Sequence, residues 1–351
     1  MKQEKRARDW NITIGTLPAG PRNKITDVKG ITVGHVTIKD KDIHTGVTAI
    51  LPHQGNLFKE KVVGASHVLN GFGKTMGTVQ INELGTIETP ILLTNTLSVG
   101  NCATGLIKYT LRDNPEIGRT TGTVNPIVAE CNDMYLNDIR HISINENHVY
   151  EAIRDAKVDY AEGAIGAGTG MKCFGLKGGI GSSSRVISIQ GKTFTIGALA
   201  LTNFGRLHDL MINGKKIGES ISNSMENSND MDKERGSVII IVATDLPVTE
   251  RQLQRIIKRC GIGLSHTGSK MGHGSGDIVI GFTTASTIAH DSTKKILSHD
   301  FIHEEELDLA FHAVAEATEE GIINSLLASE TTTGRAGKKL ESLTEYINDF
   351  F

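Results

Sequence analysis

The pattern of hydrophobic and polar positions predicts strands and helices in similar amounts along the chain. Segments rich in Val, Ile and Thr that are interrupted by Gly or Pro are typical of strands, whereas apolar residues spaced three and four apart are typical of helices. The predicted strands are 12–17, 25–38, 44–52, the start of 90–113, the hairpin 185–205 with its turn at Gln190-Gly191, 238–242 and 278–286. The predicted helices are the end of 90–113, 146–163, 249–260 with Gly261 as its stop, and 304–329. This mixture favours an α/β layered sandwich.

The segment from Asn213 to Gly236 differs from the rest of the chain, because it consists almost entirely of Asn, Ser, Asp, Glu, Lys and Gly. A segment of this composition buries little apolar surface, so we expect an exposed, mobile loop. Structureless loops of this length are uncommon in compact domains and tend to be functional. The β-branched run from Val238 to Val242 follows, and it predicts a strand buried on both faces. Ser237 therefore stands between a flexible segment and a rigid one.

Composition and charge exclude several classes of protein. The 351 residues carry a formal net charge of -3 with acidic and basic residues intermixed, which argues against a nucleic-acid partner. No apolar run reaches the roughly 18–20 residues that a membrane span needs, and the polar N-terminus shows no signal-peptide pattern. The four cysteines are scattered without a CxxC pair. We therefore expect a reduced, cytoplasmic protein without disulfides or a zinc site.

The junction Gly236-Ser237 is a candidate reactive bond. A serine hydroxyl needs a base, and an N-terminal serine can use its own α-amine, whose pKa is near ~7.7–8.0. To expose that amine, the Ser237 hydroxyl has to attack the Gly236 carbonyl, which glycine leaves sterically open. Taken alone, however, a Gly-Ser pair at the start of a strand favours an ordinary turn.

Three further residues can contribute polar groups to one site. Ser275 and Asp277 lie two residues apart before a buried strand, so their side chains are expected to point the same way. Asn203 ends another buried strand, and its amide can donate to a developing oxyanion. By themselves, Ser275 and Asp277 are better explained as residues of a turn that enters a strand, and Asn203 is equally well explained as a turn residue.

Several segments in the same order resemble the self-processing family of D-aminopeptidase/esterases and β-peptidyl aminopeptidases, which are N-terminal serine nucleophile hydrolases. The matching segments are AGPRNKITDVKGITVGHVTI, ECNDMYLNDIR, EGAIGAGTGMKCFGLKGGIGSSSR, GSVIIIVATDLP and TGSKMGHGSGDI. The resemblance implies one domain, 1–351, folded as a four-layer α/β/β/α sandwich. Its layering is that of N-terminal-nucleophile hydrolases, with different connectivity. It also implies self-cleavage at Gly236-Ser237 into a larger fragment, 1–236, and a smaller one, 237–351, which stay associated.

The resemblance also implies roles for residues at matching positions. Ser237 corresponds to the nucleophile, and Ser275 and Asp277 correspond to a serine and an acidic residue that support it. Some relatives have glutamate where this chain has Asp277, whose side chain is shorter by one methylene. The family needs no metal and no organic cofactor.

The groups around the substrate come from the same resemblance. Asn203 and Tyr135 correspond to groups placed around the oxyanion, and Glu130 corresponds to a residue near the amino end of the substrate. We therefore expect release of N-terminal amino acids (L-, D- or β-) from short peptides, amides or esters. An acyltransferase with the same nucleophile and a small-molecule binding protein that never cleaves remain alternatives. The expected assembly is a homo-oligomer of processed heterodimers.

Overall fold

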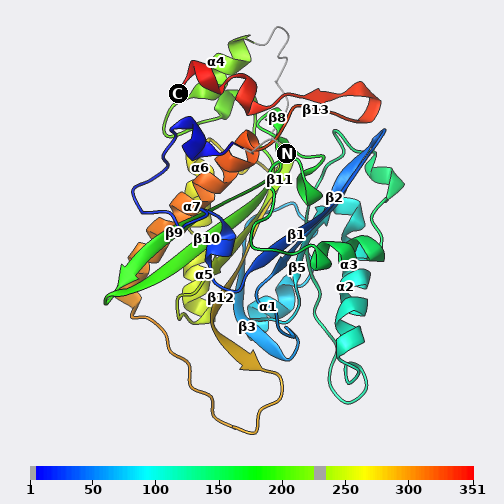
Figure 1. Ribbon diagram of the computed structural model, residues 1–351, viewed down its shortest axis with the longest axis vertical. Helices are drawn as coiled ribbons and strands as arrows, with labels where there is room; N and C mark the ends of the chain where they lie inside the picture. The colour runs from blue at the N-terminus through cyan, green and yellow to red at the C-terminus, as the bar shows by residue number, and fades with distance from the viewer. Residues whose placement is uncertain (1–4, 225–234) are drawn as a thin grey trace.

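The computed structural model describes residues 5–224 and 235–351. Figure 1 shows four layers, in which helices cover a first sheet, a second sheet packs on the first, and further helices cover the far face of the second. The expected α/β/β/α sandwich is therefore confirmed. Within the described residues, no helix is both long enough and apolar enough to cross a membrane.

The first sheet has the strand order β1-β2-β5-β6. Its strands are β1 (Thr32–Asp40), β2 (Ile43–Leu51), β5 (Ile91–Asn95) and β6 (Ile127–Cys131). The helices on its outer face are α2 (Val99–Asp113) and α3 (Glu146–Arg154). β5 and β6 run parallel, so their carboxyl ends, at Asn95 and Cys131, meet at one edge of the sheet. That edge supplies one wall of the site.

The second sheet has the strand order β4-β3-β12-β11-β10-β9. Its strands are β3 (Glu60–Gly71), β4 (Thr86–Ile87), β9 (Ile180–Ile189), β10 (Lys192–Asn203), β11 (Arg235–Thr244) and β12 (Gly274–Ala289). The helices on its outer face are α5 (Glu250–Ile257), α6 (Cys260–His266) and α7 (Leu307–Leu327). β11 pairs antiparallel with β10 and parallel with β12. The end of β10 therefore meets the starts of β11 and β12.

Smaller elements connect and flank the sheets. They are α1 (Thr78–Leu84), α4 (Ile217–Ser224), β7 (Lys172–Cys173), β8 (Leu176–Lys177), β13 (Thr332–Thr333) and β14 (Lys339–Leu340). β7 pairs with β8, and β13 pairs with β14, each as a short antiparallel ladder. These ladders lie near the start of β11 in Figure 1.

The apolar residues form three cores, one between each pair of neighbouring layers. β11 contributes to two of them, because Ile239 and Ile241 face the other sheet while Val238 and Ile240 face the outer helices. The third core lies between the first sheet and α2 and α3. The β-branched run was expected to be buried on both faces, and this expectation is confirmed. The burial of both faces fixes the strand that begins at the candidate junction.

The structure also corrects several sequence-based expectations. The predicted strand 12–17 is irregular, although Ile12 and Ile14 are buried. The helix predicted at 146–163 ends at Arg154, and Gly261 lies inside α6, so it does not stop a helix. β3 has mixed glycine and polar positions and was not predicted.

The predicted loop 213–236 is only partly irregular. Residues 217–224 form α4, where Ile217 and Ile221 lie four positions apart and are both buried, so they supply an apolar face. Residues 225–234 lie outside the described part of the chain, so the expectation of a mobile loop stays untested there.

Candidate active site

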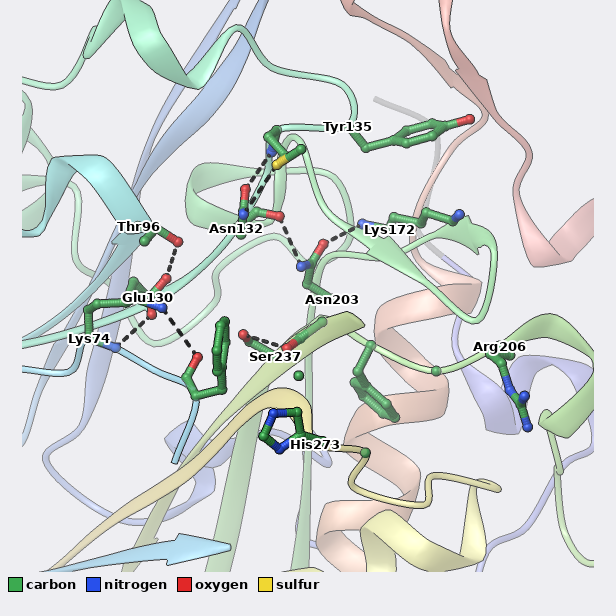
Figure 2. Close-up of a pocket in the computed structure, with 17 residues that line it drawn as sticks. Lys74, Thr96, Glu130, Asn132, Tyr135, Lys172, Asn203, Arg206, Ser237 and His273 are labelled. Carbon is green, nitrogen blue, oxygen red and sulfur yellow. Dashed lines mark hydrogen bonds between the residues drawn. The ribbon is translucent and has the colours of Figure 1, made fainter. Parts of the chain in front are cut away.

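A cavity of about 990 Å³ opens where β10, β11, β12 and the carboxyl edge of the first sheet meet. Figure 2 shows the side chains around it. The lining residues are Phe72, Lys74, Thr96, Glu130, Asn132, Met134, Tyr135, Lys172, Asn203, Phe204, Gly205, Arg206, Gly236, Ser237, Gly272, His273 and Gly274. The volume is within the usual range for sites that bind small molecules.

Ser237 lies on the wall of this cavity near the start of β11. Its Oγ donates a hydrogen bond of 2.7 Å to the carbonyl oxygen of Gly236, so the hydroxyl lies directly beside the bond predicted to break. Gly236 has no room for a side chain, because a Cβ there would lie 2.2 Å from the Asn203 carbonyl oxygen and 2.7 Å from the Phe204 Cα. Glycine is therefore required at this position by close packing against β10.

Asn203 is the last residue of β10 and pairs with Ser237 across the antiparallel ladder. Its Oδ1 accepts a hydrogen bond of 3.0 Å from the backbone N–H of Lys172, and its Nδ2 donates one of 2.9 Å to the carbonyl oxygen of Asn132. These two partners fix the orientation of the amide, because a backbone N–H requires an acceptor and a carbonyl requires a donor. The described residues supply no acceptor for the second Nδ2 hydrogen, which remains for another acceptor in the cavity.

Ser275 and Asp277 lie on β12 beside Ser237. In the parallel register, Ser237 is opposite Gly276, and the two polar residues stand on either side of that glycine. Ser275 Oγ donates a hydrogen bond of 2.5 Å to Asp277 Oδ1, which agrees with the expectation that their side chains point the same way. Both residues are buried, and neither lines the cavity. They form a polar pair behind its wall.

Glu130 is a buried carboxylate at the end of β6 that faces the cavity. Its Oε1 accepts a hydrogen bond of 2.9 Å from the backbone N–H of Lys74, and its Oε2 accepts one from the Thr96 hydroxyl. These two hydrogen bonds hold the carboxylate in place. A fixed carboxylate in a small-molecule cavity is suited to bind a substrate cation.

Tyr135 also lines the cavity, but Figure 2 shows its ring pointing away from Ser237. The expectation that Tyr135 is placed around the oxyanion of the substrate stays a prediction. The ring instead packs against two ammonium groups, since Lys172 Nζ and Lys338 Nζ each lie 4.9 Å from its centroid. Both distances are within the range of a cation–π interaction.

Several cavity residues were not identified from the sequence. Phe72 and Lys74 belong to the GFGKT segment at the end of β3, whereas Asn132 lies two residues after Glu130 and supplies the acceptor for Asn203. Asn132 lies in a segment that carries the family resemblance, so the resemblance could have identified it. Lys172 and His273 also lie in segments that carry the resemblance, although their glycine-rich sequences show no local pattern that indicates a cavity.

The described side chains around the cavity do not form a metal-binding cluster. Within residues 5–224 and 235–351, no group of three or more His, Cys, Asp or Glu side chains is arranged to hold a metal ion.

Comparison with known proteins gives consistent results over nearly the whole chain. The sequence model of peptidase family S58 matches residues 23–340. The β-peptidyl aminopeptidase BapA of Sphingosinicella microcystinivorans is 34% identical over 359 aligned residues, which cover 96% of this chain and 89% of the relative.

Comparison with solved structures gives the same family of proteins. The crystal structure of the PH0078 protein from Pyrococcus horikoshii OT3 superposes with a TM-score of 0.93 at 48% identity, covering 98% of each chain. The L-aminopeptidase D-Ala-esterase/amidase of Ochrobactrum anthropi, described as a variant of the Ntn hydrolase fold, superposes with a TM-score of 0.90 at 32% identity. That match covers 96% of this chain and 95% of the other.

Proposed function

This chain belongs to peptidase family S58, and we propose that it is a self-processing serine aminopeptidase whose nucleophile is Ser237. The family and the aminopeptidase relatives make it a hydrolase. One observation carries the assignment of the nucleophile: the Ser237 hydroxyl lies 2.7 Å from the Gly236 carbonyl oxygen, on the wall of the cavity.

The first step of the proposed reaction is cleavage of the chain itself. Ser237 Oγ attacks the Gly236 carbonyl carbon, the bond to the Ser237 nitrogen breaks, and that nitrogen takes up the hydroxyl proton. The product is an ester between Gly236 and the Ser237 hydroxyl, with a free α-amine on Ser237. Water then hydrolyses the ester, which leaves a Gly236 carboxylate and restores the hydroxyl.

The second step is turnover of a substrate at the same hydroxyl. The neutral Ser237 α-amine takes the proton while Oγ attacks the scissile carbonyl, and the amine then returns the proton to the leaving group. The free Nδ2 hydrogen of Asn203 stabilises the oxyanion, and the Glu130 carboxylate binds the amino group of the substrate. Water completes the cycle by releasing the acyl group.

Ser275 and Asp277 are proposed to support the new α-amine. Their hydrogen-bonded pair lies on the strand next to Ser237, where a carboxylate favours a protonated neighbour. The activities of the related aminopeptidases support short peptides, amides or esters as substrates. Processing into 1–236 and 237–351, a homo-oligomer of these heterodimers and a cytoplasmic location stay predictions.

The sheet order supports a single domain that survives cleavage. β11 and β12 would belong to the small fragment, yet they lie between β3 and β10 of the large fragment. The two fragments would therefore share one hydrogen-bonded sheet and the cores on both of its faces.

Replacement of the nucleophile tests the proposal. We expect Ser237→Ala to give a folded chain of full mass under denaturing conditions, with no aminopeptidase activity, because both steps need the hydroxyl. The wild type should give two fragments, and the smaller should begin Ser-Val-Ile. Ser265→Ala, an exposed hydroxyl on α6, is the matched control and should be cleaved and active. A cleaved or active Ser237→Ala chain would assign the nucleophile to another residue.

A further inference from the structure

The charges in the cavity are distributed unevenly on the two sides of the nucleophile. Figure 2 shows Glu130 and Thr96 on one side of Ser237, and Lys172 and Arg206 on the other. Glu130 is the only carboxylate among the described residues that line the cavity. A substrate that spans Ser237 therefore meets a negative group at one end and positive groups at the other.

The cations in the cavity differ in whether their charge is already compensated. The Arg206 guanidinium forms an ion pair of 2.7 Å with Asp209, which also binds Lys270. Lys74 lies on the Glu130 side, with its Nζ 4.4 Å from the Phe72 ring centroid and 3.5 Å from the Phe72 carbonyl oxygen. Neither residue is a free cation at the far end of the cavity.

Among the described residues, Lys172 has no such compensation. Its Nζ shares the Tyr135 ring with Lys338 Nζ, each 4.9 Å from the centroid, and neither ammonium pairs with a carboxylate in residues 5–224 or 235–351. Two ammonium groups held on one aromatic ring repel each other, and an anion bound near them relieves this repulsion. The partly buried position of both lysines strengthens the attraction for an anion.

We propose that Lys172, aided by Lys338, binds the carboxylate of the leaving amino acid, so that dipeptides with a free carboxyl terminus are the preferred substrates. The inference rests on the proposed function. The substrate ammonium would bind Glu130, the scissile carbonyl would face Ser237, and the terminal carboxylate would reach Lys172. This order follows the order of the three residues across the cavity.

The role of Lys172 is separable from the orientation of Asn203. Asn203 Oδ1 is held by the backbone N–H of Lys172, whereas the proposed contact with substrate uses the side-chain ammonium. A side-chain substitution at this position therefore removes the charge and keeps the backbone donor.

The test compares two substrates that differ only in their terminal group. With the N-terminal residue that the processed enzyme removes best, kcat/KM is measured for Xaa-Ala and for Xaa-Ala-amide. We expect the wild type to prefer the free carboxylate by about 10- to 100-fold, the usual worth of a hydrogen bond to a charged group. Lys172→Met should bring this ratio close to one, mainly through KM, and Lys172→Arg should retain most of it. Both kcat/KM values are measured on the same preparation, so their ratio does not depend on the fraction of active enzyme.

Lys192→Met is the matched control, because Lys192 is exposed and begins β10, whereas Asn203 ends that strand at the cavity. Its ratio should equal that of the wild type. A wild type that cleaves the amide as well as the free dipeptide overturns this inference alone, as does a Lys172→Met variant that keeps the preference. A wild type that cleaves neither substrate overturns the proposed function and the inference with it.

Discussion

Asn203 and Ser237 form the last residue pair of the antiparallel ladder between β10 and β11. Partners in such a ladder have neighbouring side chains on one face of the sheet. One backbone register therefore places the proposed oxyanion donor next to the proposed nucleophile, without any loop between them. Elements of regular structure hold functional groups more firmly than loops do.

The first prediction concerns the amide of Asn203. Asn203→Asp keeps an acceptor for the Lys172 N–H and removes the Nδ2 donor. We expect kcat of the processed enzyme to fall by about 10²–10³, the usual cost of losing one oxyanion donor. The melting temperature checks that the variant is folded. Asn147→Asp, exposed on α3, is the control and should keep full activity. An unchanged kcat in Asn203→Asp would leave Asn203 with a structural role only.

A second prediction follows from the tight packing of Gly236. Gly236→Ala places a Cβ 2.2 Å from the Asn203 carbonyl oxygen, so β11 has to move away from β10 at the bond to be cut. We expect self-cleavage to slow at least about 100-fold, because misplacement of a reacting group by about 1 Å costs that much. Intact mass against time after synthesis measures the rate. Gly122→Ala meets no atom within 4 Å and should be cleaved like the wild type. Wild-type cleavage in Gly236→Ala would contradict the packing argument.

The third prediction concerns stability against pH. His35 is buried on β1, where its Nε2 lies 3.1 Å from the Ala161 carbonyl oxygen and its Nδ1 lies 2.9 Å from the Thr48 hydroxyl. The carbonyl requires a donor, so the neutral ring carries its proton on Nε2. Burial lowers the pKa of His35 from 6.5 to about 4, although the charge of Asp155 opposes the shift.

The sign of the effect follows from this pKa. Between pH 6.5 and about 4 the unfolded chain binds more protons at this residue than the folded chain does, so the free energy of unfolding falls as the pH is lowered. His35 contributes up to about 3 kcal/mol to the free energy of unfolding, and this contribution is fully present above pH 6.5. Urea unfolding at pH 7 and pH 4.5 measures it, in the Ser237→Ala background so that one chain unfolds. His35→Gln should lose less stability between the two pH values, and an equal loss in both would contradict the prediction.

The sequence predicts the elements that a local pattern of residues indicates. The hairpin formed by β9 and β10 follows from two β-rich runs around Gln190-Gly191, and both turn residues have positive φ, 50° and 75°. Burial of both faces of β11 follows from five consecutive β-branched residues, and the hydrogen bond between Ser275 and Asp277 follows from the two-residue period of a strand.

Other features depend on contacts between distant parts of the chain, so no local sequence pattern indicates them. β3 contains Gly64, Ser66 and Asn70, and it is a strand because β12 and β4 pair with it on either side. The two lysines on Tyr135 come from segments far apart in sequence. The family resemblance assigns Tyr135 to the oxyanion, which stays a prediction, and the direction of its side chain depends on these neighbouring residues.

The position of β11 and β12 inside the second sheet has a consequence for the lifetime of the processed protein. Before the cut, folding is a first-order reaction of one chain, which can be repeated after each unfolding. A chain cut after Gly236 would unfold into two separate polypeptides, and the larger would lack the two strands between β3 and β10. Its recovery would then be second order and would slow with dilution, as for an obligate dimer. The cut that creates the nucleophile would thus make unfolding hard to reverse, and the working life of the enzyme would be set by its rate of unfolding.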